Sequence, residues 1–320
     1  MAVLLEPFQY EYMLKAIVMC VLVGAVCAFL STYLVLKGWS LMGDALSHSV
    51  VPGVAGAYAL NLPYAIGAFF TGILAALAMG LVKHFTKLKE DAIIGLIFSS
   101  FFAVGLLIIS LNPTSISINS IIFGNVLGIS DSDVLQATFI TVISLIILLL
   151  FWKDLMLIFF DEVQAATLGM PVTRLKILFF VLLSACTVAA LQTVGAILVI
   201  AMVITPGATA YLLTDRFGIM LTLAVIIGAM TSFIGAYASF FLPGGSTGSF
   251  IVILQSTLFI LAFLFAPKYG RIAKIRAAKL HQYSHKTDLK STYPESTNQA
   301  HQHAENDLQN DPKNAREIAS

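Results

Sequence analysis

Charged side chains are scarce in this chain. Asp, Glu, Lys and Arg together make up 11% of the 320 residues, whereas hydrophobic residues make up 58%. A water-soluble domain needs more polar surface than such a composition can supply. The formal net charge is only +1, which gives no reason to expect a nucleic acid as partner. The composition therefore excludes an ordinary soluble protein and indicates that lipid covers much of the surface.

Cysteine is also scarce, and its spacing excludes the common thiolate sites. The three cysteines, Cys20, Cys27 and Cys186, all lie in apolar blocks, and no Cys-x-x-Cys or mixed Cys/His ligand spacing occurs. We therefore predict that they are small buried residues of helices, with neither a disulfide nor a thiolate metal site.

Two signals of enzymatic activity are missing or incomplete. The chain has no Gly-x-x-x-x-Gly-Lys-[Ser/Thr] phosphate-binding loop, so we do not expect it to hydrolyse ATP by itself. A Gly-x-Ser-x-Gly pattern surrounds Ser246, but a hydrolase needs this pattern in a strand-turn-helix setting with a histidine partner. We predict a flexible loop there, no enzyme, and no permanently bound cofactor. An intramembrane enzyme that uses Ser246 is the remote alternative.

What the chain does contain is a series of hydrophobic blocks. Each is about 20 residues long, the length that an α-helix needs to cross a hydrocarbon core ~30 Å thick. They predict an all-α, polytopic transmembrane bundle of about eight or nine spans. A short segment at 204–214, which contains Pro206 and Gly207, is expected to be a broken helix that lines a cavity. The other spans are expected at 13–36, 39–60, 64–82, 92–111, 134–152, 176–203, 217–242 and 249–267.

Three regions follow from these blocks. Residues 1–12 form an N-terminal segment without the basic start of a signal peptide, so the first block is expected to stay as a membrane helix. Residues 13–267 form the transmembrane domain. Residues 268–320 form a basic segment and a polar tail, which we predict to be disordered. The tail holds four histidines, including His301 and His303, and a solvated tail is a better explanation of them than metal sampling.

The distribution of basic residues predicts the orientation of the chain. Lysine and arginine concentrate at 83–89, 153–176 and 268–279, whereas 112–133 and 243–248 contain none. Cytoplasmic loops carry the excess of basic residues. We therefore expect the N-terminus outside and the C-terminal tail in the cytoplasm.

Two ionisable residues, Asp44 and His48, lie inside the apolar segment 39–60. Their spacing places both side chains on one face of a helix. Ionisable groups within a membrane are costly, so they pair, face a cavity or bind an ion. Carboxylate and imidazole suit Mn²⁺, Fe²⁺ and Zn²⁺, and a two-fold dimer with its pathway on the axis would double the two ligands.

A structural interpretation of this pair stays open. An Asp to His hydrogen bond that pins two helices together needs no transport role, and Ser47 and Ser49 are placed to satisfy the pair in either case. Glycines and Pro52 in the same segment indicate a bend or a re-entrant loop, so the depth of the pair is not determined by counting residues.

The loop at 161–173 has the length of a short helix followed by a glycine cap and a turn. Its acidic start, Asp161 and Glu162, suits the positive end of a helix dipole. An ordinary amphipathic loop is the alternative.

Several long sequence motifs resemble those of one family and occur in the same order. They are Leu36-Lys37-Gly38-Trp39-Ser40-Leu41-Met42-Gly43-Asp44-Ala45-Leu46-Ser47-His48, Ala92-Ile93-Ile94-Gly95-Leu96-Ile97-Phe98-Ser99-Ser100, Phe123-Gly124-Asn125, Gln192-Thr193-Val194-Gly195 and Thr205-Pro206-Gly207-Ala208-Thr209-Ala210. In these motifs the chain is similar to the membrane permeases of bacterial ABC importers for manganese, iron and zinc (the ABC-3 type), above all to the chelated-iron and manganese permeases. The likeness runs from about 13 to 267 and leaves out the tail.

The resemblance implies a fold like that of type II ABC importer permeases and a homodimer, or a pair with a paralogous permease, in the cytoplasmic membrane. It implies two copies of a separate ATPase subunit, which uses the ATP, and a periplasmic metal-binding protein. It gives Asp44 and His48 the role of a metal-contacting gate. It makes 161–173 the coupling helix that docks on the ATPase, with Glu162, Gly169 and Pro171 as its recognisable positions.

Function is therefore expected to be the ATP-driven import of Mn²⁺ or Fe²⁺, with Zn²⁺ as a further candidate. A proton-coupled secondary carrier, in which Asp44 and His48 relay protons alongside the metal, is the alternative. Ligand chemistry alone does not identify the metal, because such sites generally bind Mn²⁺ more weakly than Fe²⁺ or Zn²⁺.

Overall fold

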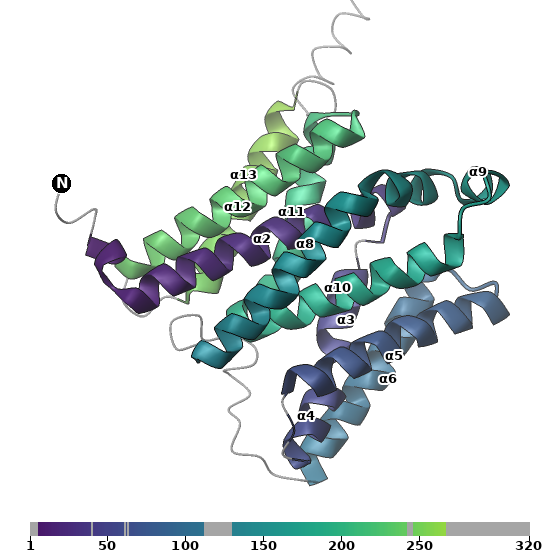
Figure 1. Ribbon diagram of the computed structural model, residues 1–320, viewed down its shortest axis with the longest axis horizontal. Coiled ribbons are helices and arrows are strands. Elements are labelled where there is room, and N and C mark those ends of the chain that lie inside the picture. The colour runs from purple at the N-terminus through teal and green to yellow at the C-terminus, as the bar shows by residue number, and fades with distance from the viewer. Residues whose placement is uncertain are drawn as a thin grey trace, which may run out of the picture. The chain divides into compact units, whose positions relative to one another are not determined.

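The computed structural model describes residues 6–39, 41–60, 62, 64–111, 130–241 and 246–266. These residues are almost entirely helical and contain no β-strand (Figure 1). The expected all-α bundle is confirmed. The helices are η1 (Glu6–Gln9), α2 (Glu11–Lys37), α3 (Met42–Ser49), α4 (Val51–Ala59), α5 (Tyr64–Phe85), α6 (Glu90–Leu111), α8 (Asp131–Phe160), α9 (Glu162–Thr167), α10 (Val172–Val194), α11 (Ala196–Leu213), α12 (Phe217–Phe241) and α13 (Thr247–Phe265).

The chain divides into two units, Met1–Phe263 and Leu264–Ser320. Nearly all described residues belong to the first unit. The predicted polar tail and the motif Phe123-Gly124-Asn125 lie outside the described residues.

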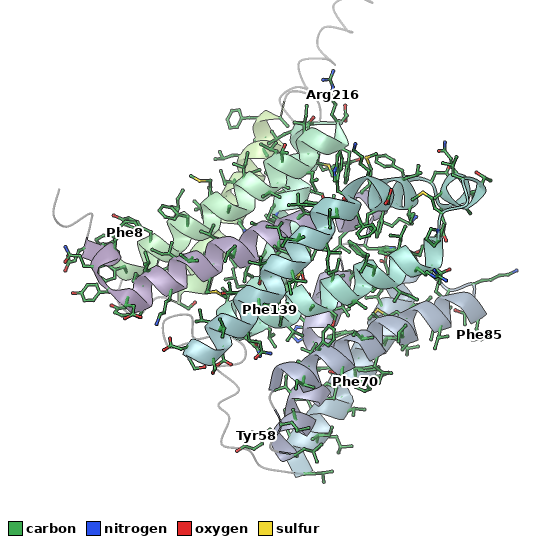
Figure 2. All side chains as sticks on the ribbon, viewed as in Figure 1. Phe8, Tyr58, Phe70, Phe85, Phe139 and Arg216 are labelled. Atoms are coloured by element: carbon green, nitrogen blue, oxygen red, sulfur yellow. The ribbon has the colours of Figure 1, made fainter. Side chains whose placement is uncertain are left out.

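Seven of the described helices are long and apolar enough to cross a membrane: α2, α5, α6, α8, α10, α12 and α13. Helix α11 is a shorter apolar helix, and α3 and α4 together replace the single span expected at 39–60. Large apolar side chains on the outside are strongly exposed, among them Phe70 (69%), Phe139 (68%) and Phe85 (80%) (Figure 2). So much exposed apolar surface is suited to lipid rather than to water.

The expected boundary at residue 204 is wrong. Gly195, with φ of 84°, separates α10 from α11, and α11 then continues without a break past Pro206. The prediction failed because a positive φ at one glycine interrupts a helix without changing the hydropathy around it. Pro206 is tolerated because a side chain from another helix, Ser31 of α2, bonds to the backbone at this turn.

Small residues bring pairs of helices very close together. Where α2 crosses α12, a Cβ added at Gly24 would lie 2.9 Å from the carbonyl oxygen of Gly228. Where α4 crosses α5, a Cβ added at Gly53 would lie 2.0 Å from the carbonyl oxygen of Gly67. Membrane helices commonly associate through such small residues, since no hydrophobic effect drives them together within lipid.

Contacts between helix ends show which of them lie at the same end of the bundle. At one end, Tyr33 near the end of α2 donates a hydrogen bond to the Trp152 carbonyl oxygen at 2.9 Å and packs on Phe217 at the start of α12. At the other end, Lys15 near the start of α2 pairs with Asp131 at the start of α8 at 2.8 Å. The helix ends that flank segment 153–176, the end of α8 and the start of α10, thus lie at the first of these two ends.

Candidate functional site

The segment that carries Asp44 and His48 begins where α2 stops. Gly38 adopts a left-handed conformation with φ of 76°. Its N–H donates to the Val35 carbonyl at 3.1 Å, and the N–H of Trp39 donates to the Leu34 carbonyl at 2.8 Å. This is the Schellman arrangement, which ends a helix and satisfies its last carbonyls. The chain turns there and starts the new helix α3 at Met42.

Helix α3 is short, and a second break follows the pair. It ends at Ser49, and α4 starts at Val51 with Pro52 in its first turn, a position that proline favours. The bend expected from the glycines and Pro52 is therefore present. The pair lies on the first of two short helices, between the end marked by Trp39 and the break at Val50.

The structure brings Asp44 and His48 together on one face of α3. His48 Nε2 lies 3.3 Å from Asp44 Oδ1, and the side chains of His48 and Asp44 are 30% and 37% exposed. Both residues belong to the same helix, so their contact does not pin two helices together. Both side chains are therefore partly exposed rather than buried in the bundle.

The serines beside the pair do not satisfy it. Ser47 donates to the Gly43 carbonyl at 2.8 Å, and Ser49 donates to the Ala45 carbonyl at 2.6 Å. Each hydroxyl thus serves the backbone of its own helix one turn earlier, a usual place for serine within a helix. The expectation that they could serve the pair is not met.

Two aromatic rings from α6 form a wall behind His48. The centroids of Phe98 and Phe102 each lie 5.5 Å from the imidazole centroid, and the two phenyl rings stack on each other at 6.0 Å. This wall limits the orientations that the imidazole can adopt. The sequence alone did not assign Phe98 and Phe102 a role, although their i,i+4 spacing places both side chains on one face of a helix.

Helix α11 supports α3 from another side. A Cβ added at Gly43 would lie 2.7 Å from Cγ1 of Val203, so α3 sits directly on α11 just before Asp44. Helices α5 and α10 also contact α3. The polar pair is thus carried by a short helix enclosed by four others.

One chain offers few metal ligands. Within the described parts of the chain, no group of three or more His, Cys, Asp or Glu side chains comes together. Cys20, Cys27 and Cys186 are buried and free of disulfides, as predicted. A metal at Asp44 and His48 would thus have two side-chain ligands of these types from this chain, which suits a site of transit better than one of permanent binding.

The turn between α8 and α10 has the local structure expected from its sequence. Asp161 caps α9, because its Oδ1 accepts hydrogen bonds from the backbone N–H groups of Val163 and Gln164 at 2.9 and 3.0 Å. Gly169, with φ of 75°, ends the helix, and Pro171 directly precedes α10. Glu162 forms an ion pair with Lys176 of α10.

Helix α9 lies apart from the long helices, at the tip where α8 ends and α10 begins (Figure 1). Its large apolar side chain, Val163, is 73% exposed, and Leu168, which follows the helix, is 65% exposed. Such residues on a capped, well-formed turn provide a surface suited to a protein partner.

Ser246 has a structural role. Its hydroxyl accepts a hydrogen bond from the Ser249 N–H at 3.2 Å, in the first turn of α13. It is therefore a helix cap, which accounts for the serine without hydrolase chemistry.

A bundle of membrane-spanning helices that surrounds an acid and imidazole pair on a broken helix is typical of membrane transport proteins. Comparison with known proteins gives the family: residues 9–266 match the model of the ABC 3 transport family. The chain belongs to this family, and it is a multi-pass membrane permease.

Named relatives cover nearly the whole membrane domain. The chain is 70% identical to the chelated iron transport system membrane protein YfeC of Yersinia pestis over 270 residues, which are 84% of this chain and 92% of that protein. It is 49% identical to the manganese transport system membrane protein MntB of Synechocystis over 274 residues, 85% and 88% of the two chains. The solved structure of PsaBC from Streptococcus pneumoniae in complex with Fab matches with a TM-score of 0.76 at 36% identity, covering 86% of this chain and 99% of that chain.

Proposed function

We propose that this chain is the translocating permease subunit of an ATP-driven importer for a divalent transition metal in a bacterial cytoplasmic membrane. Mn²⁺ and Fe²⁺ are the favoured substrates, with Zn²⁺ as a further candidate. The observation that carries the proposal is the partly exposed pair of Asp44 and His48 on α3. Its ligand chemistry agrees with the iron and manganese systems named among the relatives.

Asp44 and His48 act as a transient metal site. A transit site has to bind well enough to strip part of the hydration shell, yet weakly enough to release the ion. Two ligands from one chain meet that condition. In a dimer, a second permease subunit placed across the pathway would bring a matching pair and complete the coordination for a short time.

The exposed turn at α9 docks on a separate ATPase subunit, two copies of which serve the permease dimer. Glu162 holds the turn to α10 through Lys176, Gly169 ends α9, and Pro171 directly precedes α10. These contacts attach the turn to α10, so a movement of the turn also moves α10. Metal arrives from a periplasmic binding protein, and ATP-driven closure of the ATPase pair shifts the helices to alternate access.

The test is uptake of Mn²⁺, Fe²⁺ and Zn²⁺ into right-side-out vesicles that contain the permease and its ATPase partner, with ATP enclosed in the vesicles and the metal-binding protein added outside. Asp44→Asn and His48→Ala should each reduce ATP-dependent uptake by about tenfold or more, because each removes one of two ligands. Asp91→Asn is the matched control, since Asp91 is an exposed carboxylate in the first turn of α6 and should leave uptake unchanged.

Undiminished uptake in both Asp44→Asn and His48→Ala would refute the site. The proton-coupled alternative predicts a different result, namely uptake that survives the loss of the ATPase and collapses with the proton gradient. Dissipating the gradient at constant ATP therefore separates the two mechanisms.

A further inference from the structure

Trp39 lies in the link between α2 and α3, where α6, α8 and α10 also meet. It is 8% exposed and sits between the end of α2 and the start of α3. Its ring stacks on Phe180 of α10 with centroids 5.6 Å apart, and it meets the edge of Phe159 of α8 at 5.7 Å. Its indole N–H donates to the carboxylate of Glu90 at the start of α6.

Two of these contacts lead to the two ends of the α9 turn. Phe159 belongs to the last turn of α8, directly before the Asp161 cap of α9. Phe180 lies on α10 one turn beyond Lys176, which pairs with Glu162 of α9. A displacement of α9 therefore moves both aromatic partners of Trp39, because α8 and α10 hold α9 from either side.

The other contacts of Trp39 lead to the metal pair. The Trp39 carbonyl accepts a hydrogen bond from the Met42 N–H at 3.1 Å, so the residue is attached to the first turn of α3, which contains Asp44. Glu90 begins α6, the helix whose Phe98 and Phe102 stand against His48. Movement at Trp39 thus acts on both the helix that carries the pair and the helix that walls it.

The surroundings allow the indole to move. An open pocket of about 370 Å³ adjoins Trp39 between α5, α6 and α10, lined also by Met42, Glu90 and Phe180. On the side of this pocket the indole is not held by the close packing of a protein interior, so it has room to shift. Lys83, which pairs with Glu90 and lies 5.4 Å from the Trp39 ring centroid, keeps the carboxylate in place on the other side.

We propose that Trp39 is a positioning residue that transmits the movement of α9 to the Asp44 and His48 pair, with Glu90 as its anchor. The inference rests on the proposed function, because it requires that an ATPase moves α9. It adds a residue that contacts neither metal nor ATPase and that sets how strongly the two are coupled.

The experiment measures that coupling directly. The permease and a hydrolysis-deficient ATPase partner are assembled in lipid nanodiscs, and Mn²⁺ affinity is measured by calorimetry without nucleotide and with ATP. In the wild type, the Mn²⁺ affinities with and without ATP should differ by about tenfold, within the usual range for coupled sites. Trp39→Phe keeps an aromatic ring but removes the N–H donor. It should bring the ratio close to one while changing the nucleotide-free affinity by less than about twofold, because the metal ligands are untouched.

Three further variants make the test specific. Trp152→Phe is the matched control, since Trp152 is the other of the two tryptophans and lies on α8 away from α3; it should keep the wild-type ratio. Glu90→Gln retains an acceptor for the indole N–H and should also keep the wild-type ratio of affinities. Glu90→Leu removes the acceptor and should behave like Trp39→Phe, and the double variant should be no worse than either single one.

A wild-type ratio in both Trp39→Phe and Glu90→Leu would overturn the inference alone. So would an equal loss of affinity with and without ATP in these variants, because that result marks a merely structural role. If the wild-type complex itself bound Mn²⁺ without any effect of ATP, or did not bind it, the inference and the proposed function would both fall.

Discussion

The turn around Pro206 depends on one serine from a different helix. Proline has no N–H, so the helical bonding of α11 is interrupted at this point. Ser31 of α2 compensates: its Oγ accepts from the Gly207 N–H at 3.0 Å and donates to the Ile204 carbonyl at 3.0 Å. Ser31 is fully buried, so water does not replace it. The turn also lies next to Val203, on which Gly43 of α3 rests.

Ser31→Ala should destabilise the permease by about 1–2 kcal/mol. Removing the hydroxyl leaves the buried Gly207 N–H without its acceptor, which costs about 1–3 kcal/mol in general. Hydrogen bonds between membrane helices average nearer 0.6 kcal/mol, with a maximum of about 1.7 kcal/mol, which lowers the expectation. The measurement is the free energy of unfolding of the purified protein in mixed micelles, titrated with denaturing detergent and followed by circular dichroism.

Thr32→Val is the matched control. Thr32 is the next residue and equally buried, but its hydroxyl donates to the Phe29 carbonyl of its own helix at 2.7 Å, so its loss should cost less than about 0.5 kcal/mol. Pro206→Ala restores an N–H to α11, and in that background Ser31→Ala should cost less than it does alone. If Ser31→Ala were no more harmful than Thr32→Val, or if its cost did not change with Pro206→Ala, the compensating role of Ser31 would be refuted.

Two further predictions concern the metal pair and the α9 turn. Gly43→Ala places a Cβ 2.7 Å from Val203 Cγ1, so it should displace α3 and lower ATP-dependent Mn²⁺ uptake. Adding Val203→Ala should restore part of that uptake. Normal uptake by the Gly43→Ala permease would contradict the idea that α3 rests closely on α11. Gly169→Ala meets no atom within 4 Å but forces alanine into φ of 75°, at a cost of about 1 kcal/mol. It should weaken ATPase binding in a pull-down assay, whereas Gly218→Ala, equally uncrowded but helical, should not.

Features encoded by local sequence were predictable. Apolar blocks of membrane-spanning length predicted most of the long helices, because no other segment can satisfy its backbone in lipid. The i,i+4 spacing predicted that Asp44 and His48 share a face, and the structure places them 3.3 Å apart. Asp161 and Gly169 predicted the start and end of a short helix, since a cap and a left-handed glycine act over a few residues only.

The boundary between α10 and α11 was not predictable in the same way. Hydropathy continues through Gly195, whereas Pro206 is a strong local signal for a break. The sequence near Pro206 contains no hint that Ser31, far away in the chain, bonds to the backbone on both sides of the proline. A proline rule applied locally therefore placed the break in the wrong position.

The surroundings of the metal pair show the same limit more generally. Asp44 and His48 lie one turn apart on one helix, but the residues around them come from elsewhere: Phe98 and Phe102 on α6, Val203 on α11, and Glu90 through Trp39. Each of these residues is an ordinary one for its own segment, an apolar residue in an apolar helix or an acidic residue at a helix start. Their significance arises only when the bundle brings four helices around α3. The proposed mechanism requires such dependence, because a pair held by α3 alone would not respond to a movement that begins at α9.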